Sequence, residues 1–183
     1  MIKILHTGDI HLGSLTGPEK NGINLRREDT LRCMYEIVQT AREERPDLAI
    51  IAGDLFNRSR VWADTALDDV RDAEEHFLRP LCECCGNVVL LFGTANHDNP
   101  KAFENIFAMA NDLDNLNVNT TPAVYRLRCN NGSWVQIMAI PGFDKGRLRV
   151  FCPGMDKEAE NFNATAFIND TIIGLAGKCD KDI

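Results

Sequence analysis

The sequence lacks an excess of positive charge, a long hydrophobic run and any repeated or low-complexity segment. Its 20 Lys and Arg stand against 27 Asp and Glu, so the formal net charge of the 183 residues is −7. Bulk positive charge therefore does not hold nucleic acid here, and phosphate recognition needs local cations. No apolar run approaches the roughly 20 residues of a membrane span, and the first residues lack the pattern of a secretory signal. We expect a soluble cytoplasmic protein, without membrane contact, whose residues 1–183 form a single domain.

Cysteine usage does not indicate a disulfide framework, because the number of cysteines is odd and they are scattered apart from one cluster. That cluster is Cys82, Cys84 and Cys85. One interpretation is a soft-metal or redox site. The other, which we favour, is a group of free thiols near the end of a helix in a reducing compartment.

Three short apolar segments, residues 3–7, 48–52 and 87–92, are typical of strands, and each ends at a glycine or a Gly-Asp pair. Between and after them, apolar residues recur at three- and four-residue spacing. This spacing predicts helices over residues 29–42, 66–81 and 100–110. Alternating strands and helices favour an α/β fold with a parallel sheet and right-handed crossovers.

The remainder of the chain has a different pattern. Residues 124–129 and 134–140 are rich in strand formers and flank an Asn-Asn-Gly turn, which predicts a β-hairpin. Residues 142–156 are expected to form a loop, and residues 157–176 a last helix.

Polar side chains follow each of the three predicted strands. These residues are Asp9 and His11, then Asp54, then Asn96, His97 and Asp98. The carboxyl ends of parallel strands meet at one edge of a sheet, where ligands bind in open α/β folds. Carboxylate oxygen and imidazole nitrogen together suit manganese or iron, with zinc as an alternative, whereas an all-oxygen magnesium site is disfavoured.

The ordered Asp-x-His, Gly-Asp and Asn-His-Asp motifs resemble those of the calcineurin-like metallophosphoesterases. Residues 4–13, 25–29 and 46–56 resemble the SbcD-type double-strand-break repair exonucleases more specifically, through His-Leu-Gly and Gly-Asp-Leu-Phe. The resemblance covers about residues 1–141. It implies an α-β-β-α sandwich, and we expect this chain to stop before the last strands of the second sheet.

The resemblance also implies roles for single residues. Asp9 and His11 would ligate one divalent metal ion, Asp54 would bridge two, and Asn96 would ligate the second while touching the scissile phosphate. His97 would act as an acid or stabilise the transition state. The two ions, manganese first and iron, zinc or magnesium as alternatives, would acidify a water and offset charge on the attacked phosphate.

Asp98 has two interpretations, a partner that orients His97 or a cap on the third helix. The basic side chains also have two interpretations, which are contact with a DNA backbone and simple exposure to solvent. The candidates for DNA contact are Arg26, Arg27, Arg58, Lys145 and Arg147, of which Arg26 is the first choice because it lies in a family-like segment.

The family completes its metal site with later histidines, yet no histidine follows His97. We therefore expect the chain by itself to be inactive or nearly so as a nuclease. The leading hypothesis is a metal-dependent DNA exonuclease or endonuclease whose partner is an SMC-like ATPase, with oligomerisation left open. The alternatives are a phosphodiesterase or phosphatase for a small substrate, and a non-catalytic structural or interaction module.

Overall fold

A parallel four-stranded sheet forms the centre of the computed structural model, which describes residues 1–13, 16–57, 65–94, 96–142, 154 and 156–183. The strands, in spatial order, are β1 (Ile4–Thr7), β4 (Leu48–Ile51), β5 (Asn87–Leu91) and β6 (Leu116–Asn119). The first three confirm the predicted strands. Strand β6 was not predicted, because half of its residues are asparagines, which are depleted in strands.

All three pairings in this sheet are parallel. β1 pairs with β4 from Ile4 opposite Leu48 onward, and β4 pairs with β5 in the same direction. The segments that follow these strands therefore emerge at one edge. Backbone hydrogen bonds continue beyond the strands, from the amide of Asp9 to the carbonyl of Gly53 at 3.2 Å and from that of His11 to the carbonyl of Asp54 at 3.0 Å.

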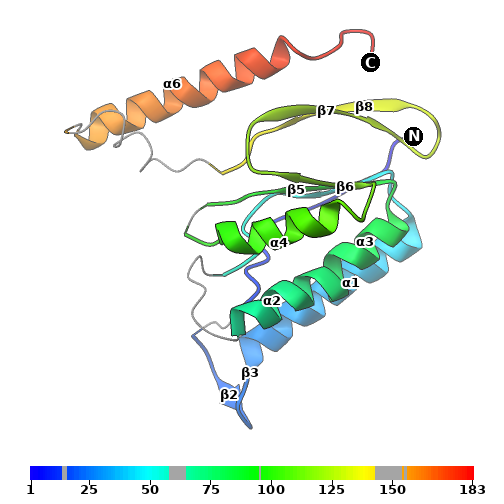
Figure 1. Cartoon of the computed structure of the whole chain (residues 1–183), viewed down its shortest axis with the longest axis vertical. Coiled ribbons are helices and arrows are strands. Elements are labelled where there is room, and N and C mark those ends of the chain that lie inside the picture. The colour runs from blue at the N-terminus through cyan, green and yellow to red at the C-terminus, as the bar shows by residue number, and fades with distance from the viewer. Residues whose placement is uncertain (14–15, 58–64, 95, 143–153, 155) are drawn as a thin grey trace.

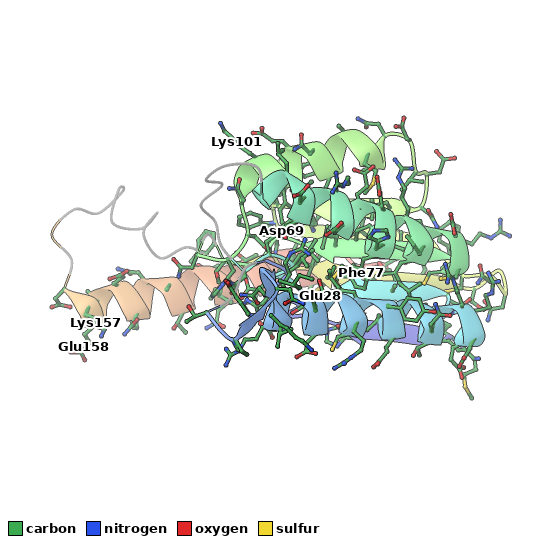
Figure 2. The ribbon with its side chains drawn as sticks, turned by 90° about the horizontal axis from the view of Figure 1, so that it is seen from below. Glu28, Asp69, Phe77, Lys101, Lys157 and Glu158 are labelled. Carbon is green, nitrogen blue, oxygen red and sulfur yellow. The ribbon has the colours of Figure 1, made fainter. Side chains whose placement is uncertain are left out.

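Helices cover one face of this sheet (Figure 1). They are α1 (Leu25–Glu44), α2 (Thr65–Ala73), the π-helical turn η1 (Glu74–Leu78), α3 (Arg79–Cys84) and α4 (Pro100–Ala110). The main hydrophobic core lies between helices and sheet, and it includes Phe77, which has no exposed surface (Figure 2). The predicted helices are thus present.

Helix α1 begins four residues before the predicted start because Asn24 caps it. The Asn24 side chain accepts a hydrogen bond from the amide of Arg27 at 3.1 Å. Met34, Val38 and Ala41 form its buried stripe. The helix ends where Arg45 adopts a left-handed conformation and donates its amide to the carbonyl of Ala41.

The predicted helix over residues 66–81 is wrong in one respect, because it is not uniformly α-helical. The π-helical turn η1 separates α2 from α3. Pro80, in the first turn of α3, has no N–H to donate to the preceding turn. A widened turn directly before it accommodates that loss.

The other face of the sheet carries the predicted hairpin, β7 (Ala123–Arg128) and β8 (Trp134–Ala139), which pair in antiparallel register. Leu127 packs there against Leu48 and Val89 in a second, smaller core. Beyond the hairpin lies α6 (Lys157–Ala176), with the predicted bounds. Helices, sheet, hairpin and α6 form the expected α-β-β-α order of layers.

Helix α6 makes limited contact with the rest of the described chain. The side chain of Gln136 in β8 exchanges two hydrogen bonds of 2.6 Å with the backbone of Asp180, just beyond the helix. Figure 2 shows the opposite end, at Lys157 and Glu158, projecting past the other elements. The exposed apolar side chains of α6 are Phe162, Phe167, Ile172 and Ile173.

A short hairpin of β2 (Glu19–Lys20) and β3 (Ile23–Asn24) precedes α1 and was not predicted. The predicted loop over residues 142–156 lies mostly outside the described residues. Among the described helices, none has both the length and the apolar character that a membrane span requires.

Candidate metal centre

The loops that follow β1 and β4 bring Asp9, His11 and Asp54 together. One donor atom from each lies within 4.8 Å of the other two. His11 Nε2 is 3.7 Å from Asp9 Oδ1, and the Asp9 side chain is largely exposed. Three side chains predicted from separate parts of the sequence therefore meet at the carboxyl edge of the sheet.

The same three residues share an unusual backbone conformation. Their φ angles are 52° for Asp9, 53° for His11 and 51° for Asp54, in the left-handed region. This region costs free energy for residues that carry a β-carbon, and such strain clusters at functional sites. The backbone hydrogen bonds between the two loops hold the three residues there.

The Asp54 carboxylate is fixed by the loop that follows β5. Its Oδ1 accepts a hydrogen bond from the amide of Thr94 at 2.8 Å, with the Thr94 hydroxyl at 3.4 Å. The loop approaches so closely because residue 93 is glycine. A β-carbon at Gly93 would lie 2.1 Å from Asp54 Oδ1, and one at Gly142 would lie 1.9 Å from the Gly93 carbonyl oxygen.

Gly93 and Thr94 open the third sequence motif, but no role at the site was predicted for them or for Gly142. Gly93 also ends a strand, but many glycines in that position merely form turns. Gly142 follows β8 and reaches the site only through the tertiary fold, where its amide donates to the carbonyl of Phe92 at 2.8 Å.

His97 joins this group from the third loop. Its ring packs edge-on against that of His11, with the two ring centroids 4.5 Å apart. His97 Nδ1 lies 3.1 Å from the carbonyl oxygen of Asn57. A carbonyl oxygen only accepts hydrogen bonds, so Nδ1 carries the hydrogen and Nε2 is left for another partner. Asn96 is exposed in the turn directly before His97.

Asp98 has neither of the two predicted roles, which were to orient His97 or to cap α4. Its buried carboxylate accepts hydrogen bonds from the amides of Asp54 and Phe56, each at 3.0 Å, and from that of Gly93 at 2.5 Å. Asn99, not Asp98, caps α4, by accepting from the amide of Lys101 at 2.7 Å. Asp98 was expected to orient the neighbouring His97. Instead, its carboxylate links the loop after β4 to the loop after β5.

Burial raises the pKa of the Asp98 carboxyl. The negative charge of Asp54 acts in the same direction, whereas the three backbone amides favour the ionised form and limit the rise. The Asp98 carboxylate can be fully buried because three backbone N–H groups donate hydrogen bonds to its two oxygens.

The donor set fits a first-row divalent ion, because it combines two carboxylates with an imidazole. His11 also fits this interpretation, since its Nδ1 is buried without a hydrogen-bond partner among the described residues. A ring nitrogen that no protein group engages is available to a metal ion. Asp9, His11 and Asp54 would hold the ion.

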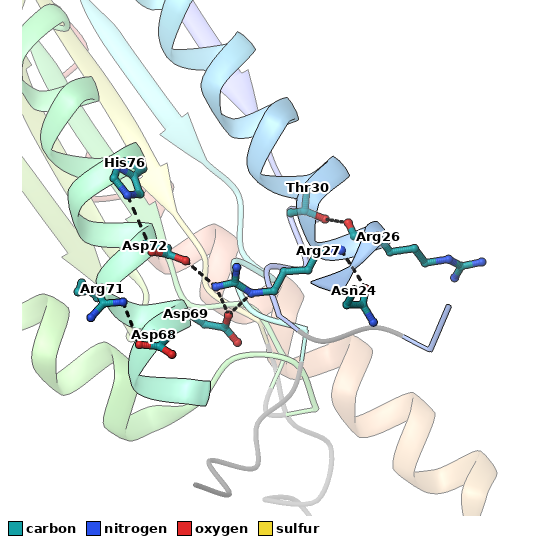
Figure 3. Close-up of polar contacts among 9 residues, drawn as sticks. All are labelled: Asn24, Arg26, Arg27, Thr30, Asp68, Asp69, Arg71, Asp72 and His76. Atoms are coloured by element: carbon teal, nitrogen blue, oxygen red, sulfur yellow. Dashed lines mark hydrogen bonds and ion pairs between the residues drawn. The ribbon is translucent and has the colours of Figure 1, made fainter. Parts of the chain in front are cut away.

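The two adjacent arginines of α1 differ in their surroundings. Arg26 is exposed, whereas Arg27 forms ion pairs with Asp69 at 2.9 Å and Asp72 at 2.5 Å (Figure 3). Burial alone would lower the pKa of Arg27, but its hydrogen bonds to Asp72 and Asp69 raise it overall. A DNA phosphate would compete with two carboxylates for Arg27. Arg58, Lys145 and Arg147 lie outside the described residues.

The cysteine cluster lies in α3 and directly after it, away from the metal loops. Burial raises the pKa of both Cys82 and Cys85 to about 12. The Cys84 thiol donates a hydrogen bond to the carbonyl of Pro80 at 2.9 Å. Thiols that stay protonated make poor nucleophiles and poor metal ligands, which supports the interpretation as buried free thiols.

Comparison with known proteins agrees with this geometry. Residues 2–172 match the calcineurin-like phosphoesterase family. The chain is also 36% identical over 100 residues to the DNA double-strand break repair protein Mre11 of Aeropyrum pernix. That match covers 55% of this chain and 22% of the Aeropyrum protein, so the chain spans about a fifth of that relative's length.

Proposed function

Because the chain belongs to the calcineurin-like phosphoesterase family, we propose that it contributes to a metal-dependent site that hydrolyses phosphodiester bonds in DNA. The observation that carries the proposal is the convergence of Asp9, His11 and Asp54 within 4.8 Å. The likeness to a DNA double-strand break repair protein favours DNA over other phosphodiesters. The more specific expectation of an SbcD-type exonuclease or endonuclease belongs to this proposal.

We assign the ligands as the family motifs suggest. Asp9 and His11 would hold one ion, Asp54 would contribute to both ions, and Asn96 would hold the second ion and contact the phosphate. Divalent ions bound there supply Lewis acidity to the phosphate and to the attacking water. Manganese is the first choice for this mixed oxygen and nitrogen donor set, with iron, zinc and magnesium as alternatives.

His97 acts on the phosphate through its Nε2 atom. The carbonyl of Asn57 accepts from Nδ1 at 3.1 Å and the ring rests against His11, so the imidazole is held from two sides. When protonated, Nε2 donates a hydrogen bond to a phosphate oxygen or a proton to the leaving oxygen.

Recognition of DNA needs cations near this edge of an otherwise acidic protein. Arg26 is the best described candidate, because it is exposed and directly precedes Arg27, whose partner Asp69 lies beside the loop that carries His11. An SMC-like ATPase partner and action on DNA in the cytoplasm complete the proposal, and oligomerisation is compatible with it.

A non-catalytic module is the second candidate, and one observation favours it. Within residues 98–183 there is no histidine, whereas the family motifs include later histidines among the metal ligands. Coordination positions filled by water instead of protein weaken metal affinity. A phosphodiesterase or phosphatase for a small substrate is the third candidate, because the described ligands do not distinguish between phosphoesters.

Metal binding and hydrolysis are measured separately to test this. We expect isothermal titration calorimetry to detect Mn²⁺ binding to the chain, abolished by Asp54→Ala and unchanged in Asp114→Ala, which alters an exposed turn residue. Incubation with linear duplex DNA and with bis(p-nitrophenyl) phosphate then measures turnover. We expect slow but measurable Mn²⁺-dependent cleavage of DNA, lost in Asp54→Ala.

The outcomes separate the three candidates. Cleavage of the small diester without cleavage of DNA would favour the small-substrate enzyme. Mn²⁺ binding without any hydrolysis would favour the non-catalytic module. A chain that binds no Mn²⁺, or binds it equally well after Asp54→Ala, would contradict the metal site itself.

A further inference from the structure

The ion pairs of Arg27 lie close to the metal loops, although Arg27 itself is on α1. Its Nε donates to Asp69 Oδ1 at 2.9 Å, and its Nη2 donates to Asp72 Oδ2 at 2.5 Å. The side chains of the three residues are only 15–20% exposed. One guanidinium thus holds two carboxylates of α2 against the start of α1, as Figure 3 shows.

Asp69 also lies against the loop that carries the first metal ligands. A β-carbon at Gly13 would lie 3.1 Å from Asp69 Oδ2 and 3.5 Å from the β-carbon of Asn57. Gly13 is two residues after His11, and its φ of 141° is one that side-chain-bearing residues rarely adopt. Asp69 and Asn57 therefore both lie beside Gly13 in the loop after β1.

Asn57 connects this contact to the other two loops. Its amide donates to the carbonyl of Leu12 at 2.8 Å, which binds the loop after β4 to the loop after β1. Its carbonyl oxygen accepts from His97 Nδ1 at 3.1 Å, which binds the loop after β5. A displacement of Asp69 would thus reach His11 through Gly13 and His97 through Asn57.

We propose that Arg27 is a positioning residue, which holds Asp69 against Gly13 and so fixes the rings of His11 and His97 relative to each other. The inference rests on the proposed metal-dependent function. Without Arg27, Asp69 would lose its countercharge and Asp72 would keep only the exposed His76, whose Nε2 lies 3.9 Å from Asp72 Oδ1, so the two partly buried carboxylates would separate. Lysine is not equivalent, because it lacks the planar fork that contacts both carboxylates.

Substitution of Arg27 with a matched control tests this role. Arg27→Gln removes the charge that holds Asp69 and Asp72. Arg71→Gln removes an arginine from an exposed ion pair on α2, with Asp68, and is the control. The first readout is the NMR spectrum of the histidine rings in metal-free protein, in which His6 on β1 serves as an internal reference.

We expect Arg27→Gln to shift the ring signals of His11 and His97 while that of His6 stays in place. The second readout is the Mn²⁺ affinity of the folded protein from calorimetry. We expect Arg27→Gln to weaken it by about tenfold, as is typical when a residue that supports a metal ligand is lost. Arg27→Lys should recover part of the affinity, and Arg71→Gln should change neither readout.

Asp69→Asn tests the same contact in case Arg27→Gln does not fold, because it retains the pair between Arg27 and Asp72. It should shift the same two ring signals. Unchanged His11 and His97 signals and unchanged Mn²⁺ affinity in either folded variant would overturn the proposal. If the parent chain binds no Mn²⁺, the proposed function fails, but the metal-free spectra still decide whether Arg27 positions the rings.

Discussion

Asp9, His11 and Asp54 combine a strained backbone with side chains that converge. A left-handed conformation costs about 1–2 kcal/mol for a residue with a β-carbon. Asp tolerates it better than most residues, because its short side chain forms local hydrogen bonds. The strained backbone therefore lowers the stability of the site but directs the three ligand side chains toward one another.

Replacement of Asp9 separates the strain from the ligand. Asp9→Ala and Asp9→Gly both remove the carboxylate, but only glycine adopts the φ of 52° without strain. We expect the glycine variant to be more stable than the alanine variant by about 1 kcal/mol, because relief of strain exceeds the entropic cost of glycine. Urea unfolding in the presence of EDTA measures the difference.

Asp114 provides the control for this comparison, since it lies in an exposed turn and outside the left-handed region. There the order should reverse, with the alanine variant the more stable of the two. An Asp9→Ala protein as stable as Asp9→Gly would show that the left-handed backbone at this position is not strained.

Among the described helices, the two longest are α1 and α6, which have 20 residues each but pack very differently against the rest of the chain. Helix α1 places Met34, Val38 and Ala41 in the main core. Helix α6 exposes large apolar side chains, among them Phe162 at 74% and Ile173 at 70%. Local stability depends on how much of an element is buried. Two helices of equal length can therefore differ in how well their amides are protected from hydrogen exchange.

Hydrogen exchange should reveal this difference. We expect the amides in the middle of α6 to exchange about a hundredfold faster than those in the middle of α1, because α6 opens without disrupting the core. Exchange followed by mass spectrometry compares the two helices in one sample, so α1 is the internal control. Equal protection would mean that α6 opens only when the whole domain unfolds.

Elements with a clear pattern of apolar residues were predictable from the sequence. Elements that form only through contacts with other parts of the chain were not. The strands β1, β4 and β5 are short apolar runs, and the turn at Gly132 has the positive φ that an Asn-Asn-Gly sequence favours. By contrast, β6 is half asparagine and is a strand because β5 pairs with it. Its sequence alone carries little strand preference.

Across the whole molecule, the predicted residues Asp9, His11 and Asp54 lie together because the parallel strands before them end at one edge of the sheet. The order of the motifs therefore predicted the meeting of Asp9, His11 and Asp54. The residues that hold them in place were not predictable in this way. The assignment of Asp98 depended on whether its carboxylate turned toward His97 or toward three backbone amides, which sequence position does not determine.

Metal binding should stabilise the entire fold, because the ligands belong to loops from two strands and form no site in the unfolded chain. At a free Mn²⁺ concentration of 100 times the dissociation constant, we expect the free energy of unfolding to rise by about 2.7 kcal/mol. Thermal unfolding monitored by circular dichroism, with and without Mn²⁺, measures this rise. Asp54→Ala should show none, and a rise of equal size in that variant would indicate nonspecific binding.

The order of the strands along the chain also governs when the metal centre can form during synthesis. Asp9 leaves the ribosome first, but its loop is bound to that of Asp54, and Asp54 is in turn fixed by Thr94 and Asp98. At about 5–20 residues per second, the last of these follows the first by roughly 4–18 seconds. A nascent chain therefore displays isolated acidic and imidazole groups for several seconds, and the metal centre can form only after residue 98 has been synthesised.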